Sequence, residues 1–421
     1  MFTDAVAGKY AGSSELVGLC DVSPARMAWH NKRLASKFGH APVATYLASD
    51  FDRMVAEAKP DVVIVTTVDA VHHQYIVRAM ELGCDAISEK PMTTDAEKVR
   101  AIFDAIARTG RKLRVSFNYR YAPHLTKVRE MIAAGAIGTP NLVDFQWLLD
   151  TSHGADYFRR WHAEKRHSGG LLVHKSTHHF DLVNWWIDSR PKTVFAMGSL
   201  GFYGRVAAEG RGQAVTYDKS RDAPADDPFK FDWNKRPDQF ELYRGAAEEE
   251  SGYVRDRNVF GGHVTIEDTM AVNVRYRNGV ILSYSLVAYS PWEGFRVTFT
   301  GTKGRLEMTS SHSSHVFSAN EDEVARANAH RDRHRLVYFP MHGKPEDLHV
   351  PTAEGGHGGG DAVLLEQLFS DNPPPDPFDR AASHIDGAAS CLVGIAANES
   401  IETGMPVEVD RLLPLPQGAR A

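Results

Sequence analysis

The sequence has few cysteines and no long hydrophobic run. Only three cysteines occur among its 421 residues, and they lie far apart at Cys20, Cys84 and Cys391. This spacing excludes a disulfide framework and a zinc ribbon, and it is typical of a reducing compartment. No apolar stretch reaches the roughly 20 residues that span a bilayer, and no signal peptide is visible. We therefore expect a cytoplasmic protein without a membrane partner, although an export signal upstream of Met1 is an alternative.

An excess of basic charge is also missing. The formal net charge is -6, which argues against a nucleic-acid partner because such proteins usually carry a basic patch. Hydrophobic residues make up 43% and charged residues 24%, a composition typical of soluble proteins with sizeable cores. The length favours two domains over one.

The first 120 residues alternate strands and helices. Strands are predicted over residues 15–21, 60–67, 84–91 and 112–120, and helices over 23–39, 72–83 and 93–110. Short strands separated by single helices predict a doubly wound parallel sheet, a Rossmann-type domain over residues 1–120. Its ligand should lie at the carboxyl ends of the strands. The residues assigned to the cofactor there are Asp21, Thr66, Thr67, His72, Glu89, Lys90, Asn118 and Arg120.

Asp21 suggests which dinucleotide would bind. A carboxylate at the end of this strand accepts hydrogen bonds from both adenosine ribose hydroxyls and repels a 2'-phosphate, so NAD is favoured over NADP. A helix-capping or solvated aspartate is the alternative. The glycine-rich G-x-G-x-x-G loop is absent. The first segment, "MFTDAVAGKYAGSSELVGLCD", resembles the helix that normally follows that loop, so we expect the sequence to begin inside this helix. We expect the first strand and the loop just upstream of Met1, over roughly 10 to 20 residues. A chain that truly lacked them would bind pyrophosphate poorly.

From about Tyr121 the pattern changes to an α+β domain over residues 121–421. Strand alternation around a turn at Asn278-Gly279 predicts a hairpin in a large, mostly antiparallel sheet with helices on one face. Residues 201–262 are polar and read as a surface insertion, a lid or an oligomer contact. A late helix is expected over about residues 383–403.

The segment "SEKPMTTD" (88–95) places Glu89 and Lys90 at a strand end. A lysine at that edge can contact a substrate hydroxyl and assist its deprotonation. A surface ion pair between Glu89 and Lys90 is the alternative.

A basic cluster follows two glycines in "SGGLLVHKSTHHFD" (168–181). On one continuous helix, His174, His178 and Asp181 would fall at i, i+4 and i+7 and share a face. Lys175 and His179 would share the adjacent face.

Three interpretations of this cluster are open. Two histidines four residues apart can bind zinc, yet Lys175 stands where a zinc protease carries glutamate, so we expect no metal. In a structural site, Asp181 and the imidazoles would satisfy one another above Trp185 and Trp186. In an acid/base site, a histidine that titrates near neutral pH would take a proton.

Several motifs together resemble the Gfo/Idh/MocA family of sugar and cyclitol oxidoreductases. They are "VTTVDAVHHQYIVRAMELGCDAI", "SEKPMTTD", "FNYRYAP", "SGGLLVHKSTHHFDLVNWW", "GTKGRLE" and "NESIETGMPVEV". The resemblance spans nearly the whole chain. It implies a Rossmann domain that holds NAD(P) tightly and an α+β domain whose sheet often forms the oligomer interface. We therefore expect a homo-oligomer, a dimer or a tetramer.

The resemblance also implies site residues. The family's E-K-P lysine falls on Lys90, its catalytic histidine on His178 and its closing aspartate on Asp181. Two departures stand in this segment, because His174 replaces the usual aspartate and Ser176 replaces the usual glycine. With Lys175 beside them, the site is more basic than in common sugar dehydrogenases.

The sequence therefore predicts an NAD-dependent oxidoreductase acting on a secondary hydroxyl of a sugar, a glycoside or an inositol-like polyol. His178 would be the general base, Lys90 would hold the hydroxyl, and Asn118 would lie beneath the nicotinamide. His174, Lys175 and Asp181 would tune or orient the base. The residues expected to line the sugar site are Arg160, Trp161 and His162, along with Lys90 and His178. One alternative is an NAD-retaining glycosidase or lyase that uses transient oxidation, and another is a non-catalytic sugar or dinucleotide sensor.

Overall fold

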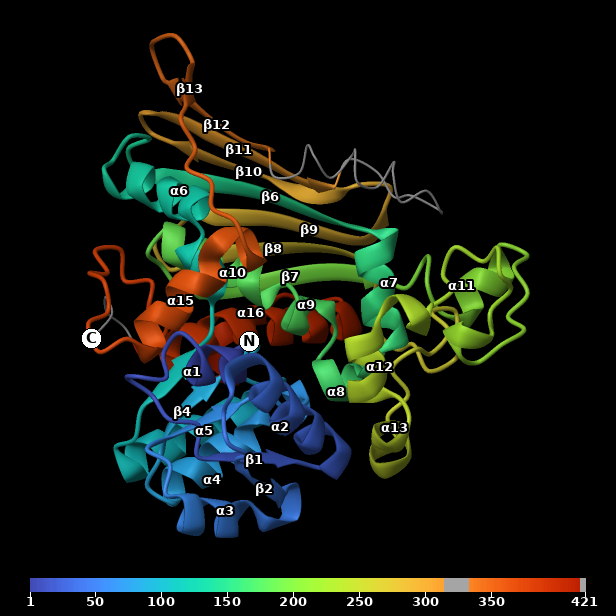
Figure 1. The fold of residues 1–421 in the computed structure, drawn as a ribbon. Coiled ribbons are helices and arrows are strands. Elements are labelled where there is room, and N and C mark those ends of the chain that lie inside the picture. The colour runs from blue at the N-terminus through green and yellow to red at the C-terminus, as the bar shows by residue number, and fades with distance from the viewer. Residues whose placement is uncertain (314–332, 417–421) are drawn as a thin grey trace.

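The computed structural model describes residues 1–313 and 333–416 (Figure 1). Its N-terminal part alternates strands with helices, as the sequence predicts. In chain order after α1 (Phe2–Ala7), the elements are β1 (Gly18–Asp21), α2 (Pro24–Phe38), β2 (Ala44–Leu47), α3 (Phe51–Ala58), β3 (Val62–Val65), α4 (His72–Glu81), β4 (Asp85–Ser88), α5 (Ala96–Thr109) and β5 (Leu113–Val115). All their strand pairs are parallel, in a β1-β2 sheet and a separate β3-β4-β5 sheet.

Local capping signals set the ends of these helices. The Ser23 side chain accepts a hydrogen bond from the Arg26 N–H at the start of α2, and Gly39 ends that helix at φ 63°. Gly110 ends α5 in the same left-handed conformation, at φ 67°. Glycine adopts this conformation without the steric cost that other residues carry. The predicted C-terminal ends of both helices are confirmed, whereas α5 starts at Ala96, three residues later than predicted, with Asp95 as its N-cap.

The last predicted strand is too long. β5 stops at Val115, and residues Asn118–Tyr121 form a short 3-10 helix, η3. The N–H groups of Phe117 and Asn118 bond to carbonyls only two residues earlier, which turns the chain out of the sheet. The turn directs Arg120 into the protein interior, where it pairs with Asp181.

The C-terminal part is built on a nine-stranded sheet in the order β13-β12-β11-β10-β6-β9-β8-β7-β14. The strands are β6 (Pro140–Asp150), β7 (Pro191–Ser199), β8 (Thr269–Tyr276), β9 (Ile281–Ser290), β10 (Glu293–Gly301), β11 (Gly304–Ser313), β12 (Arg333–Pro340), β13 (Glu346–Leu348) and β14 (Val407–Glu408). Only the central β6–β9 pair is parallel. The large, mostly antiparallel sheet is therefore confirmed, and so is the hairpin at Asn278-Gly279, where Gly279 has φ 91°.

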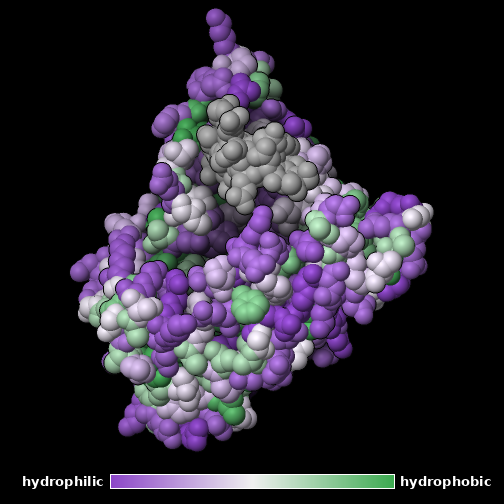
Figure 2. Space-filling model, turned by 45° about the vertical axis from the view of Figure 1, so that its right-hand side comes forward, coloured by the Kyte–Doolittle hydropathy of each residue, from purple (hydrophilic) through white to green (hydrophobic). Residues whose placement is uncertain are grey.

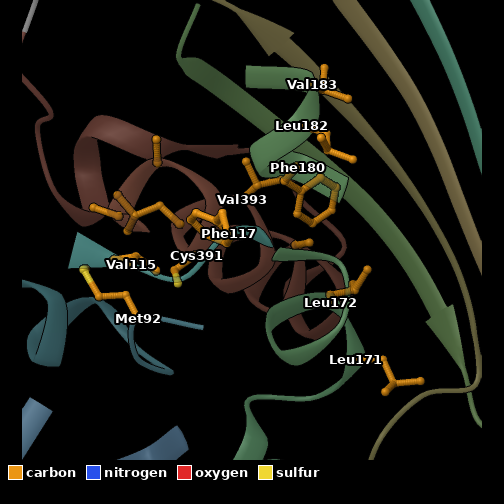
Figure 3. Packing of buried hydrophobic residues seen from close by; sticks show 14 of the residues in the cluster. Met92, Val115, Phe117, Leu171, Leu172, Phe180, Leu182, Val183, Cys391 and Val393 are labelled. Atoms are coloured by element: carbon orange, nitrogen blue, oxygen red, sulfur yellow. The ribbon is translucent and has the colours of Figure 1, made fainter. Parts of the chain in front are cut away.

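Helices α6 (Pro123–Ala133), α10 (Thr177–Trp186) and α16 (His384–Thr403) lie on the same side of this sheet (Figure 1). The last of them also contacts β5 and α5 of the Rossmann-type domain. Figure 3 shows Cys391 and Val393 of α16 close to Val115 and Phe117, with Phe180 of α10 beyond Val393. All five side chains are almost fully buried, so α16 belongs to the cores of both domains.

The polar segment over residues 201–262 folds into short helices, α11 (Arg205–Gly210), α12 (Pro237–Tyr243) and α13 (Ala246–Ser251). It contacts α2 of the Rossmann-type domain, where Glu250 Oε2 accepts hydrogen bonds from Ser23 Oγ (2.6 Å) and the Ala25 N–H (3.0 Å). Lys32 of α2 pairs with Glu241 at 3.1 Å. The insertion is thus a bridge between the domains, which the sequence did not indicate.

Candidate active site

A cleft of about 1530 Å³ opens between the end of β4 and the large sheet. Its inner wall includes Lys90, Tyr119, Lys175, His178, Glu293 and His357. Because β4 ends at Ser88, the cleft lies at the carboxyl edge of the parallel strands, where ligands of such sheets bind. The face shown in Figure 2 is mostly hydrophilic, with its hydrophobic residues in small groups.

The continuous helix predicted after Gly170 is interrupted. The chain forms α9 (Leu171–His174) and then α10, with a break at Lys175 and Ser176. The N–H groups of both residues bond to the Leu171 carbonyl, and the Ser176 hydroxyl contacts the Tyr284 hydroxyl at 2.9 Å. The prediction that His174, His178 and Asp181 share one helical face is therefore wrong, and each has different partners.

His178 lies on the cleft wall. Its ring contacts the ring of Tyr119 edge-on, with centroids 4.8 Å apart. Nδ1 is buried and has no hydrogen-bond partner in the part of the chain that the structure describes. Burial and the positive charge of Lys90 hold the pKa of His178 well below its usual value. The imidazole is therefore neutral near pH 7 and able to accept a proton.

His174 lies behind the wall, in contact with a carboxylate that the sequence analysis missed. Its Nδ1 is 2.5 Å from Asp69 Oδ2, and Asp69 is 2% exposed. On its other side, Lys90 Nζ donates to the His174 carbonyl at 3.2 Å and lies 3.5 Å from Nε2. Asp69 follows β3 in the short helix η2 (Asp69–Val71), and its place just beyond a parallel strand was the available signal.

Lys90 is half-buried and lines the cleft. Burial lowers its pKa, and the carboxylates of Asp69 and Glu89 oppose that shift. Glu89 also accepts a hydrogen bond from the Lys90 N–H at 3.1 Å. The Glu89-Lys90 pair is therefore not a surface ion pair.

Lys175 is a second lysine on the cleft wall. Its Nζ lies 5.1 Å from the centroid of the Trp147 ring and 5.9 Å from that of Tyr119. Burial lowers its pKa to about 8, against the opposing charge of Glu293. Glu293 Oε1 in turn contacts His153 Nδ1 at 2.8 Å.

Asp181 and Arg120 form a buried ion pair. The guanidinium donates to both Asp181 oxygens, at 2.5 and 2.7 Å, and to Asp386 at 3.2 Å. This occupies Arg120 inside the protein and corrects its expected place beside the cofactor. It also corrects the structural interpretation in which Asp181 would satisfy the histidines.

A glycine-rich loop adds a residue that the sequence analysis did not select. His357 Nδ1 lies 2.9 Å from Asn118 Nδ2 and from Asp361 Oδ1. A Cβ on Gly360 would lie 2.3 Å from the Asn118 carbonyl oxygen, so the loop approaches η3 as closely as only glycine allows. The run "GGHGGGD" was the signal for this contact.

Trp161 and His162 lie against His174, and Arg160 donates to Asp156 at 3.2 Å. Trp161 stacks on His162 with centroids 3.6 Å apart, and His162 is 4.2 Å from His174. The cleft itself is lined by the neighbouring Tyr157 and Arg159, so the three expected residues form a second layer.

The exposed strand ends suit a dinucleotide. Asp21 is partly exposed and accepts the Ser23 N–H at 2.9 Å, which leaves carboxylate capacity for ribose hydroxyls. Thr66 and Thr67 are exposed. Asn118 Oδ1 is buried without a partner among the described residues, and this orphaned acceptor fits an amide or hydroxyl donor. The residues present therefore fit NAD.

His72 is the exception among the residues assigned to the cofactor. Its ring nitrogens lie 3.0 Å from the Thr67 carbonyl oxygen and 2.9 Å from that of Pro91. It is buried, so it links the ends of two neighbouring strand segments through these carbonyls and does not face the cofactor site. In the described residues, no group of three or more His, Cys, Asp or Glu is arranged to hold a metal ion.

Comparison with family models matches both domains. The model described as "Oxidoreductase family, NAD-binding Rossmann fold" matches residues 3–117, and "Oxidoreductase family, C-terminal alpha/beta domain" matches residues 129–409. The chain belongs to the Gfo/Idh/MocA oxidoreductase family. As a Gfo/Idh/MocA protein it has an NAD-binding Rossmann domain, and the predicted cofactor is confirmed at this level.

Individual relatives agree with the family. YteT of Bacillus subtilis (strain 168), a protein named as an oxidoreductase, is 36% identical over 98% of this chain and 95% of its own. Inositol 2-dehydrogenase of Rhizobium meliloti (strain 1021) is 30% identical over 47% and 54%. The aldose-aldose oxidoreductase of Caulobacter crescentus shares the Gfo/Idh/MocA fold, with a TM-score of 0.60 at 16% identity over 95% and 93%. Within the described ranges, no helix is both long and apolar enough to cross a bilayer.

Proposed function

We propose that this chain is an NAD-dependent dehydrogenase for a secondary hydroxyl of a sugar, a glycoside or an inositol-like polyol. The observation that carries the proposal is that Lys90 and His178 line one cleft at the carboxyl edge of the parallel strands. The similarity to an inositol 2-dehydrogenase supports the substrate class.

In this mechanism, bound NAD supplies the hydride acceptor, with Asp21 at its adenosine end and Asn118 near the other. Lys90 donates a hydrogen bond to the substrate hydroxyl oxygen and stabilises the negative charge that develops on it. His178, which lines the cleft and is neutral at pH 7, takes the hydroxyl proton on its imidazole ring. The hydroxyl carbon loses hydride and becomes a carbonyl carbon.

The test is a panel of pyranoses, glycosides and cyclitols incubated with NAD+, with NADH followed by absorbance. We expect NADH with at least one substrate, and a loss of at least about 100-fold in Lys90→Met and His178→Asn. Lys127→Met is the matched control, because Lys127 pairs with Glu130 on α6, outside the cleft. Wild-type rates in the two site variants would overturn the proposed roles. Protein that binds no dinucleotide would favour the sensor.

One observation favours the NAD-retaining lyase as a second candidate. Lys175 faces the cleft with a pKa lowered to about 8, so it can exchange a proton near neutral pH. An elimination needs such a second base once a neighbouring hydroxyl has been oxidised. Substrate cleavage without net NADH would identify the lyase.

We also propose that the chain assembles through the sheet of the C-terminal domain. In β8 and β9, side chains alternate between buried and exposed, and the helices cover one face. The other face carries Asn273, Arg275, Ser283 and Ser285 together with the exposed Ile281, and a mixed face of this kind suits a contact between copies. Light scattering on the purified protein would show a dimer or tetramer if this holds, and a monomer would contradict it.

A further inference from the structure

We propose that Asp69 and His174 together position the ε-amino group of Lys90 and keep it protonated for substrate binding. The inference rests on the proposed function of Lys90, and it assigns a role to two residues that do not line the cleft.

The geometry gives the direction of each hydrogen bond. Burial raises the pKa of Asp69, and the positive charge of Lys90 opposes that shift. An ionised Asp69 only accepts, so with the Lys90–Asp69 pair charged the 2.5 Å contact requires a proton on His174 Nδ1. In a neutral imidazole, Nε2 is then an acceptor. His174 is neutral because burial and the charge of Lys90 hold its pKa well below the usual value.

Lys90 has three N–H donors. One donates to the His174 carbonyl, with Nζ and the oxygen 3.2 Å apart, and a second can reach Nε2, which lies 3.5 Å from Nζ. The third donor remains for the substrate hydroxyl in the cleft. If His174 carried its proton on Nε2, that hydrogen would face the ammonium group and push it away, so Asp69 fixes the direction of Lys90 by fixing the tautomer of His174.

Asp69 also acts on Lys90 through its charge. The charged and titratable groups around Lys90 are Asp69, His72, Glu89, Arg160, His162, His174, Lys175, His178, His179 and Cys391. Of these, Asp69 and Glu89 are the carboxylates, and they favour the ammonium form. Arg160 and Lys175 oppose it, so the removal of one carboxylate changes the balance.

The test compares Asp69→Asn and His174→Gln. Asp69→Asn keeps an oxygen acceptor for Nδ1–H and removes only the charge, so we expect the pKa of Lys90 to fall by about one unit. The alkaline limb of the kcat profile should move to lower pH by the same amount. His174→Gln keeps the charge of Asp69 but cannot hold both partners, so kcat should fall at least about tenfold with a smaller movement of the limb.

The pKa of Lys90 is read without turnover, by NMR titration of the reductively methylated protein with Lys90→Arg for assignment. That reading remains available if the protein oxidises none of the substrates tested, and it separates failure of this proposal from failure of the dehydrogenase. The control is Asp386→Asn, which removes a half-buried charge next to Arg120 and should leave the pKa of Lys90 unchanged. An unmoved Lys90 titration in folded Asp69→Asn would overturn the proposal.

The wild-type protein offers a second measurement if Asp69→Asn does not fold. Nitrogen-15 shifts of labelled histidine, assigned with His174→Gln, should show His174 protonated on Nδ1. Protonation on Nε2 alone would overturn the proposal.

Discussion

The side chain of Arg120 forms a two-pronged ion pair with Asp181 in which neither residue is more than 1% exposed. Breaking such a pair leaves a buried charge without its counter-ion, which costs about 3 to 5 kcal/mol. We expect Arg120→Met to lower the free energy of unfolding by that order.

Urea titration followed by circular dichroism measures this loss. The dissociation constant of NADH for the folded fraction should stay within about twofold of the wild-type value, or ~0.4 kcal/mol. A large loss of NADH affinity without a loss of stability would contradict this prediction and indicate that Arg120 contacts the cofactor.

The neutral state of His178 has a consequence for the pH profile. Because burial and the charge of Lys90 hold the pKa of His178 well below 6.5, the base is already deprotonated at pH 6.5. The acid limb of kcat should therefore lie below pH 6.5, and His178→Asn should remove it and lower kcat about 100- to 10,000-fold. Steady-state kinetics between pH 4.5 and 9 provide the measurement, and an acid limb at pH 7 or above would contradict it.

Two carboxylates stand at the start of α2. Asp21 ends β1, and Glu250 of the insertion accepts from Ser23 and the Ala25 N–H. Both would repel a 2'-phosphate, so the double variant Asp21→Ser with Glu250→Gln should raise the NADP to NAD preference on the order of tenfold. Fluorescence titration with NADPH and NADH measures it. Glu241→Gln, which loses only the exposed contact with Lys32, should leave the preference unchanged.

Lys175 makes stability depend on pH in a defined direction. Its pKa falls from 10.5 to about 8 on folding, so between those values the unfolded chain binds more protons and stability rises with pH. The full penalty, about 3 kcal/mol, is present below pH 8. Lys175→Met should therefore be more stable than the wild type at pH 7, and the difference should shrink as the pH rises to 10. Urea midpoints at the two pH values test this.

Local features of the sequence predicted the elements that depend on local physics. Ser23, Gly39 and Gly110 mark helix ends because a cap needs only its nearest neighbours. Alternating apolar and polar residues marked β8 and β9. The break between α9 and α10 escaped prediction because the Tyr284 hydroxyl that contacts Ser176 lies 108 residues away.

The same distinction applies to the site. Lys90 and His178 were found from motifs, whereas Asp69 was missed because its partner His174 is 105 residues away. His174 was instead expected on the face of His178. Arg120 was misplaced for a related reason, since only the turn after β5 shows that it points inward. Partners that meet through the tertiary fold leave no periodic pattern in the chain.

Helix α16 lies in the cores of both domains, although it is made of residues near the end of the chain. Protein engineers who exchange nucleotide-binding modules between relatives usually cut once, where the first domain ends. Here such a graft would bring a foreign partner to Cys391 and Val393, so the transplanted module should travel with its own copy of this helix.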